Sequence, residues 1–340
     1  MKFFHIFSVI AGVALLCLLV VGIGPAQLWR DMALLGWGLA PLIALDVVSQ
    51  ILHTVGWRYC LSEPLRSMPF LRLFGIRMSG LAINHLTPTA EMGGEVTKGA
   101  LLSLYHSGPQ AASGVIIGKL TYTLAQLFFI GFGSLAVLRN VELPAGALPA
   151  LLAGSALLGA GVFGFLVVQK YGKLGAAARW LAGRNIGGRV MAQAAQKITV
   201  VDNDLKCFYT ERPKGLLLSM LWHVLGLAIG IAQTWYFFVL LTGDSRFAVA
   251  AGVWMVSGWL DLLCFMIPSN IGVYEGTRVL TFKLLSLPPS LGLSYGITLR
   301  LVHLALSIIG LGMYAFFMLR ASKKKKVQAD TCMAASQKTE

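Results

Sequence analysis

The sequence predicts an all-α polytopic membrane protein with about six full spans and two re-entrant broken-helix hairpins in an inverted repeat. Of the 340 residues, 56% are hydrophobic and only 12% are charged, which is about half the charged fraction of a soluble domain. Apolar runs long enough to cross about 30 Å of hydrocarbon recur along the chain. A short motif also occurs twice, with a constant offset of 180 residues.

Most of the apolar residues fall into long runs that we expect to form one transmembrane domain over residues 1–320. The first run follows Lys2, exceeds the length of a signal-peptide core and has no small-x-small cleavage site after it, so we expect a retained helix. Two further apolar stretches, about 70–105 and 246–287, each contain a central proline. The segments long enough to span are about 4–23, 33–56, 112–138, 145–168, 215–241 and 290–319.

The net charge of +14 is concentrated beside the apolar runs. Nine Lys and Arg residues lie in a connector of about 170–214, and four more form Lys323–Lys326. Positive charge next to spans is typical of cytoplasmic loops, so we expect cytoplasmic termini and no nucleic-acid partner. The connector is either a set of helices on an anionic lipid surface or a solvated loop. We expect 321–340 to be a disordered cytoplasmic tail.

Counting spans from these cytoplasmic segments assigns a side to each connector. The connectors Arg58–Arg72 and His106–Gln110 fall on the cytoplasmic side, and the linkers near Trp29–Asp31, Arg139–Leu143 and Gly243–Ser245 face outward. Each proline-containing stretch must then begin and end on the same side. The count therefore predicts two hairpins that enter the membrane and return.

The two hairpins carry the repeated motif. Pro88–Lys98 and Pro268–Arg278 both fit P-[ST]-x5-E-x-T-[KR]. The offset extends to the flanking spans, so that a first unit of about 33–138 corresponds to a second of about 213–319. Because the hairpins enter from opposite sides, the units form an inverted repeat, the arrangement that many secondary transporters use for alternating access.

The prolines predict half-helices at membrane depth. Non-helical backbone is tolerated there only where it is buried in protein or lines a wet cavity. Pro88 and Pro268 interrupt the apolar run, and Thr89 and Ser269 are suitable N-caps for the helix that follows. A helix N-terminus attracts anions such as phosphate, so two such termini would form a polar site between the units.

Charged residues in the hairpins support such a site. A charge at the centre of a membrane helix costs about 2.5–3.5 kcal/mol, so we expect these side chains to face a cavity and to pair. The spacing favours pairs within one helix, Glu95–Lys98 and Glu275–Arg278; alternatively, these are salt bridges that only permit a broken helix. The spans themselves contribute Asp46, Lys119 and Arg300, and the hairpins contribute Arg77, Glu91, Glu95, Lys98, Asp261, Glu275 and Arg278.

The sequence predicts no cofactor, metal or catalytic site. Five cysteines show no CxxC spacing, and the histidines show no HxxxH or HExxH spacing. His85 either lines the cavity or is a satisfied interior histidine. The absence of a GxxxxGK[ST] motif argues against direct use of ATP. The acids that an intramembrane enzyme would need are present, but the sequence shows no nucleophile or metal-binding pattern beside them, which disfavours this class of protein.

At these residues the chain resembles the transmembrane family named for lysylphosphatidylglycerol synthase, over roughly residues 5–320. The resemblance rests on Asn84, on Pro88–Leu101 with its Gly-Gly-Glu, and on Ile267–Pro268 followed by Gly272–Gly276. The family includes the flippase portion of that enzyme and stand-alone members, some associated with hopanoid biosynthesis. Here no soluble synthase domain follows the membrane part, so we do not expect synthase activity.

The resemblance implies a lipid translocase of the bacterial inner membrane that moves an anionic or aminoacylated phospholipid between leaflets. Four cations (Arg77, Lys98, Arg278 and Arg300) would compensate the phosphate, Glu95 and Glu275 would orient them or accept an amine, and glycines would leave room for the head group. The alternative is a non-transporting partner that recruits or regulates a lipid- or glycan-modifying enzyme; a homo-oligomer is a further option. The candidate substrate-binding residues are Arg77, Asn84, Glu91, Gly93, Gly94, Glu95, Lys98, Asn270, Gly272, Tyr274, Glu275, Arg278 and Arg300.

Overall fold

The computed structural model describes residues 25–87, 92–137, 201–264 and 272–336, together with a few isolated positions. Every regular element in these ranges is helical, and the predicted all-α class is confirmed. The helices are α2 (Pro25–Leu35), η1 (Gly36–Gly38), α3 (Leu39–Cys60), η2 (Leu65–Ser67), α4 (Phe70–Leu86), α5 (Met92–Leu102), α6 (Gly108–Val137), α10 (Pro213–Thr242), α11 (Phe247–Cys264), α12 (Val273–Leu284) and α13 (Pro289–Ser336), with a further helical stretch at 201–211.

Several of these helices are long and apolar enough to cross a membrane, which confirms a polytopic membrane protein. They match four of the six expected spans, and the other two, about 4–23 and 145–168, lie outside the described residues. The four candidate spans within the described ranges are Trp29–Cys60, Gly108–Ser134, Pro213–Thr242 and Pro289–Ser322.

Each hairpin is interrupted around its motif proline. In the first, α4 ends at Leu86 and α5 begins at Met92. In the second, α11 ends at Cys264 and α12 begins at Val273. Residues 88–91 and 265–271, with the prolines and with Thr89 and Ser269, lie outside the described residues. The helix boundaries thus fall on both sides of each predicted break.

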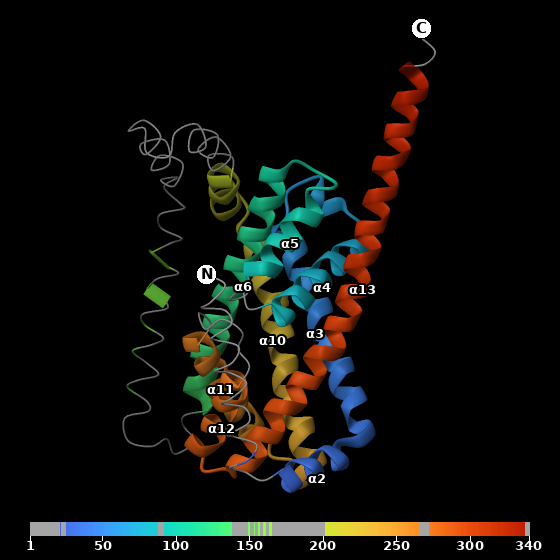
Figure 1. The fold of residues 1–340 in the computed structure, drawn as a ribbon. Helices are drawn as coiled ribbons and strands as arrows, with labels where there is room; N and C mark the ends of the chain where they lie inside the picture. Colours follow the sequence, from blue (N-terminus) through green and yellow to red (C-terminus); the bar gives the residue numbers. More distant parts are fainter. Residues whose placement is uncertain are drawn as a thin grey trace, which may run out of the picture.

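The two four-helix units, α3–α6 and α10–α13, run in opposite directions. Their first helices, α3 and α10, cross as an antiparallel pair: Cys60 Sγ lies 3.1 Å from Ser219 Oγ near one end, and Gln233 Nε2 donates to the Leu42 carbonyl at 2.9 Å near the other. Equivalent helices that run antiparallel place the two units in inverted orientation (Figure 1).

A second pair of contacts repeats this symmetry. Gly75 of α4 faces the Phe317 ring of α13, and Gly133 of α6 faces the Met255 side chain of α11. Gly75 and Met255 are separated by the offset of 180 residues that relates the two motifs. The last and longest helix of each unit, α6 or α13, therefore packs on the hairpin of the other, and the units are interlocked rather than merely adjacent.

Buried apolar side chains hold each half of the bundle together. Trp57 and Leu102 belong to a core in which α3–α6 pack with 201–211. Phe237 and Phe282 belong to a second core in which α10–α13 pack with α2 and α3. Burying side chains of this size contributes roughly 1.5–3 kcal/mol each in water. Between membrane helices, where lipid is equally apolar, close packing supplies the attraction instead.

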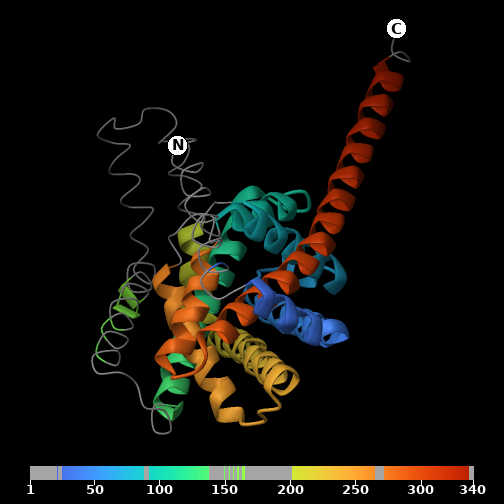
Figure 2. The same cartoon turned by 60° about the horizontal axis from the view of Figure 1, so that its bottom comes forward.

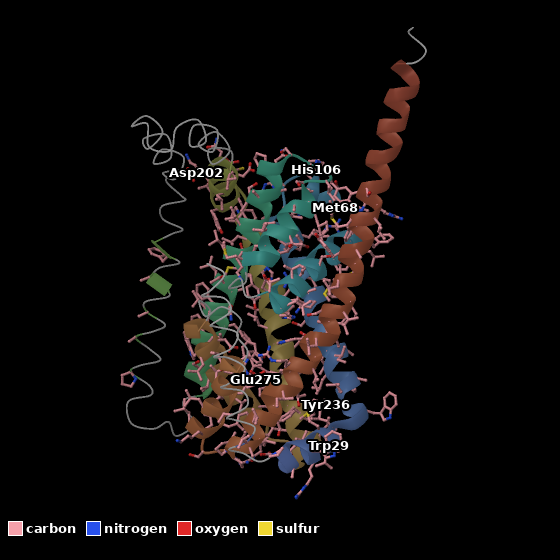
Figure 3. The ribbon with its side chains drawn as sticks, in the orientation of Figure 1. Trp29, Met68, His106, Asp202, Tyr236 and Glu275 are labelled. Atoms are coloured by element: carbon pink, nitrogen blue, oxygen red, sulfur yellow. The ribbon has the colours of Figure 1, made fainter. Side chains whose placement is uncertain are left out.

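The connectors sort to the two ends of the bundle as the span count predicts. Met68, His106 and Asp202 lie at one end, and Trp29 lies at the other (Figure 3). Helix α13 leaves the bundle at the end that holds His106 and continues beyond the other described helices (Figures 1 and 2). Which side of the membrane this end faces stays a prediction.

The end of the chain differs from the prediction of a disordered tail over 321–340. Helix α13 continues without a break to Ser336. The segment 321–336 contains neither proline nor glycine and is rich in Ala and Lys, with four of each, and both residue types have high helix propensity. Charge alone pointed to disorder, whereas continuation of an existing helix avoids the cost of nucleation.

Candidate functional site

The half-helix α12 begins at a glycine that no other residue would replace easily. Gly272 is its N-cap, with φ +74°, in the region that side chains disfavour. The Gly272 N–H donates to Oε2 of Glu275 at 2.8 Å. The N-cap of α12 is therefore Gly272 and not Ser269, the residue that we expected. The carboxylate of Glu275, in the first turn of the same helix, accepts the hydrogen bond from this N-cap.

Charged side chains in the second unit pair between helices rather than within α12. Arg278 donates to both carboxylate oxygens of Asp261 on α11, at 2.7 and 2.8 Å. Arg300 of α13 forms an ion pair with Glu275, whose side chain has no exposed surface. The prediction that Glu275 pairs with Arg278 was wrong, because packing of α12 between α11 and α13 brings each residue a partner on a neighbouring helix.

An aromatic ring joins these two ion pairs. The Tyr274 ring centroid lies 4.0 Å from the Arg278 guanidinium carbon and 5.5 Å from that of Arg300. The His303 ring approaches the same tyrosine at 5.8 Å and stacks on His85 of α4 at 4.6 Å. His85 Nδ1 also lies 3.2 Å from Ser307 Oγ. His85, which belongs to the first unit, therefore lies beside the charged residues of the second unit.

The first unit holds a related group of charges around α5. The expected Glu95–Lys98 ion pair is present, with 2.6 Å between Glu95 Oε2 and Lys98 Nζ. Lys98 also lies over the Trp57 ring of α3, 5.4 Å from its centroid. Arg77 of α4 donates to Gln50 Oε1 at 3.2 Å, and its charge interacts with Glu95 and with Asp46. Five charged or polar residues from three helices therefore converge here.

Each unit also contains a buried guanidinium nitrogen with no acceptor among the described residues. These atoms are Nε of Arg77 and Nε of Arg278. Leaving a buried donor unpaired costs about 1–3 kcal/mol. The two inverted units are therefore alike in that each leaves one buried guanidinium donor without an acceptor in the described part of the chain.

The glycines of the first motif lie in the first turn of α5, where α4 and α5 approach closely. A Cβ at Gly94 would lie 2.5 Å from Cγ of Asn84 and closer still to the carbonyl oxygen of Gly80. The Gly94 N–H donates to Asn84 Oδ1 at 2.6 Å. Gly94 therefore allows the close approach of helix α4, and Asn84 accepts a hydrogen bond from the first turn of α5; contact of either residue with a head group stays a prediction. Gly93 lies in the same first turn and accepts from Thr97 Oγ1.

The structure gathers the predicted residues into two groups, one in each unit. Arg77, Glu95 and Lys98 form the first, and Tyr274, Glu275, Arg278 and Arg300 form the second. Glu91 and Asn270 lie outside the described residues. A single pocket shared by the two groups stays a prediction.

Sequence reasoning missed several polar residues at the site. Asp261 was recognised as an interior charge but not as the partner of Arg278. His53 of α3 and His223 of α10 lie with their Nδ1 atoms 3.1 Å apart, and the Tyr122 ring meets both edge-on. Their sequence separation gave no metal-like spacing. The signal available was that both are ionisable residues inside spans, which marks functional positions by default.

The arrangement defines a class of protein: a polytopic α-helical membrane protein built from two inverted units, each with a broken helix and buried ionic groups. Residues 6–310 match the family described as the lysylphosphatidylglycerol synthase TM region, and the chain belongs to this family. The resemblance inferred from the motif residues is thereby confirmed.

A curated relative is similar over most of its length. The UPF0104 membrane protein MJ1595 of Methanocaldococcus jannaschii is 22% identical over 289 residues, which is 83% of this chain and 84% of the relative. No solved structure matches the chain. The family match covers a membrane region and indicates no catalytic activity.

Proposed function

We propose that the protein is a flippase-like lipid translocase, which moves an anionic or aminoacylated phospholipid between the leaflets of a bacterial inner membrane with both termini in the cytoplasm. The observation that supports this most directly is the unpaired Nε–H of Arg77 and of Arg278, one buried in each inverted unit. A phosphate brings several acceptor oxygens, and hydrogen bonds to its charge are about twice as strong as neutral ones.

The inverted units supply a route between leaflets. Equivalent sites in oppositely oriented units can be opened alternately to the two sides by rocking one unit against the other. In the second unit the acids hold the cations in place: Asp261 fixes the guanidinium group of Arg278, and Glu275 holds that of Arg300. The acyl chains would stay in the surrounding lipid while the head group passes through the polar interior.

Electrostatic balance favours an anionic or zwitterionic head group. In the second group two guanidinium ions face two carboxylates, so a phosphate can displace a carboxylate from one cation and the released carboxylate can accept an amine. Such an exchange keeps every charge compensated during passage, which matters because an isolated charge is costly in hydrocarbon. An aminoacylated lipid carries both of the required groups.

The test is a flipping assay with purified protein in liposomes that contain NBD-labelled phosphatidylglycerol, with dithionite reporting the exposed fraction of label. The wild type should accelerate exchange between leaflets. Glu95→Gln should slow it, and Arg278→Lys, which keeps the charge but loses the fork, should slow it by about tenfold. Arg246→Ala is the matched control, since Arg246 pairs with Asp244 in an exposed loop.

Two arms separate a lipid substrate from a free anion. Inorganic phosphate in excess should leave the flip rate unchanged if the lipid is recognised as a whole, and should compete if the phosphate group alone is bound. No acceleration with any anionic lipid would overturn the translocase and favour a non-transporting partner of a lipid- or glycan-modifying enzyme.

A further inference from the structure

Two buried histidines meet where the inverted units cross. His53 of α3 is 4% exposed and His223 of α10 is 1% exposed, and their Nδ1 atoms lie 3.1 Å apart. Each ring also packs on a glycine of the opposite helix: a Cβ at Gly226 would lie 2.7 Å from His53, and one at Gly56 would lie 3.0 Å from His223. The contact is reciprocal and lies between the two units.

The hydrogen bond restricts how the pair is protonated. Two Nδ1 atoms at this distance share one proton, so in the neutral pair one imidazole donates and the other accepts. The other nitrogen of His223, Nε2, is buried and has no hydrogen-bond partner among the described residues. When His223 is the Nδ1 donor, its Nε2 is a bare lone pair, which is where an additional proton binds.

Ionisable groups from four helices lie at the pair or beside its cations. Arg77 of α4 interacts with both histidines and Lys98 of α5 interacts with His223, and these positive charges oppose a proton on the pair unless an anion neutralises them. Tyr122 of α6 meets both rings edge-on. Asp46, on the same helix as His53, is hydrogen-bonded to Gln50 and interacts with Arg77. A change in the protonation of the histidine pair therefore changes the electrostatic environment of Arg77 and Lys98 in the first unit.

We propose that His53 and His223 form a proton-binding site whose occupancy is coupled to the binding of a lipid phosphate beside Arg77 and Lys98. This inference rests on the proposed function, which supplies the anion. A proton on the pair adds positive charge next to the two cations and strengthens phosphate binding. By linkage, a bound phosphate favours protonation by the same factor.

The proton balance of the site is simple. A proton binds Nε2 of His223, and the pair then carries one additional positive charge while the Nδ1 proton stays in the hydrogen bond between the two rings. One proton is taken up when a phosphate binds, the same proton leaves when the phosphate leaves, and no electron is transferred. Because the two rings belong to different units, rocking of the units would make or break this hydrogen bond together with access to the phosphate site.

The experiment titrates the full-length protein in detergent with dioctanoyl phosphatidylglycerol at about pH 8 and at about pH 5.5, two values on either side of the ordinary histidine pKa. Wild-type affinity should rise about fivefold or more at the lower pH. His223→Gln and His53→Gln should lose this gain, so that their affinities at the two pH values are equal. His106→Gln, at the end of the bundle (Figure 3), should keep it.

A second readout measures the proton directly. Addition of the lipid to weakly buffered wild-type protein near pH 6.5 should raise the pH of the solution as protons are taken up, and either histidine variant should not do so. A pH dependence that survives both substitutions belongs to a carboxylate and overturns the proton site. Binding without any pH dependence overturns it as well, while the translocase stands. Failure of the wild type to bind at either pH counts against the proposed function itself.

Discussion

Arg278 and Asp261 are joined through both guanidinium Nη atoms and both carboxylate oxygens, with distances of 2.7 and 2.8 Å. The Arg278 side chain is 5% exposed and that of Asp261 is 35% exposed. The pair is thus a bidentate salt bridge in which Arg278 of α12 lies in the packed interior and Asp261 of α11 is partly exposed. It fixes the two arms of the second hairpin to each other.

Removal of the acid from this pair should destabilise the protein strongly. Asp261→Asn leaves the Arg278 charge buried without compensation, and breaking one partner of such a pair costs about 3 kcal/mol or more. We expect a lower midpoint of thermal unfolding in detergent. Asp244→Asn is the matched control, because its pair with Arg246 is exposed and should change the midpoint little. Equal midpoints for the two variants would show that the Arg278 bridge does not hold the hairpin.

Much of the fold could be predicted from the motif offset of 180 residues. Adding the offset to α3 gives α10, and adding it to α6 gives the start of α13. Helix boundaries follow from hydrophobic length and from proline, which are local properties of the sequence. The inverted orientation followed from counting spans, and the antiparallel crossing of α3 and α10 agrees with it.

The partners of the charged residues could not be predicted in the same way. Spacing places Glu275 and Arg278 on one face of a helix, but the angle at which α12 packs decides which neighbour each one reaches. Glu275 reaches Arg300 and Arg278 reaches Asp261. The contact of His53 with His223 depends likewise on where α3 and α10 cross. Tertiary packing, which no local pattern encodes, set these contacts.

Gly94 should be intolerant of any side chain. Gly94→Ala places a Cβ against the Gly80 carbonyl and the Asn84 amide, so α5 must move away from α4, at a cost of about 1–3 kcal/mol. Gly99→Ala in the same helix meets no atom within 4 Å and should be neutral or stabilise by up to about 1 kcal/mol. Thermal unfolding of both variants checks this. A Gly94→Ala protein as stable as Gly99→Ala would contradict the close approach of the two helices.

The Cys207 thiol should react slowly with maleimide near neutral pH. It donates to Glu211 Oε2 at 3.1 Å, and this hydrogen bond raises its pKa above the ordinary value. A raised pKa lowers the thiolate fraction at a given pH, and the thiolate is the nucleophile. Glu211→Gln should therefore speed labelling, measured by mass spectrometry of the Cys207 peptide, and the gain should shrink as the pH rises. Thr210→Val, which leaves Glu211 in place, should label like the wild type; equal rates in all three proteins would refute the effect of Glu211.

The two ends of the bundle should lie on opposite sides of the membrane. Position 107 follows His106 at the end that also holds Met68 and Asp202, whereas Trp29 and Tyr236 lie toward the other end (Figure 3). Position 244 follows Gly243, which ends α10 at a left-handed C-cap. In a background in which all five native cysteines are replaced by serine, a membrane-impermeant maleimide added to intact cells should label Asp244→Cys and spare Ser107→Cys until the membrane is opened. Labelling of both positions from one side would mean that the two hairpins enter the membrane from the same face. The two units would then not be inverted, and alternating access by rocking of inverted units would have no structural basis.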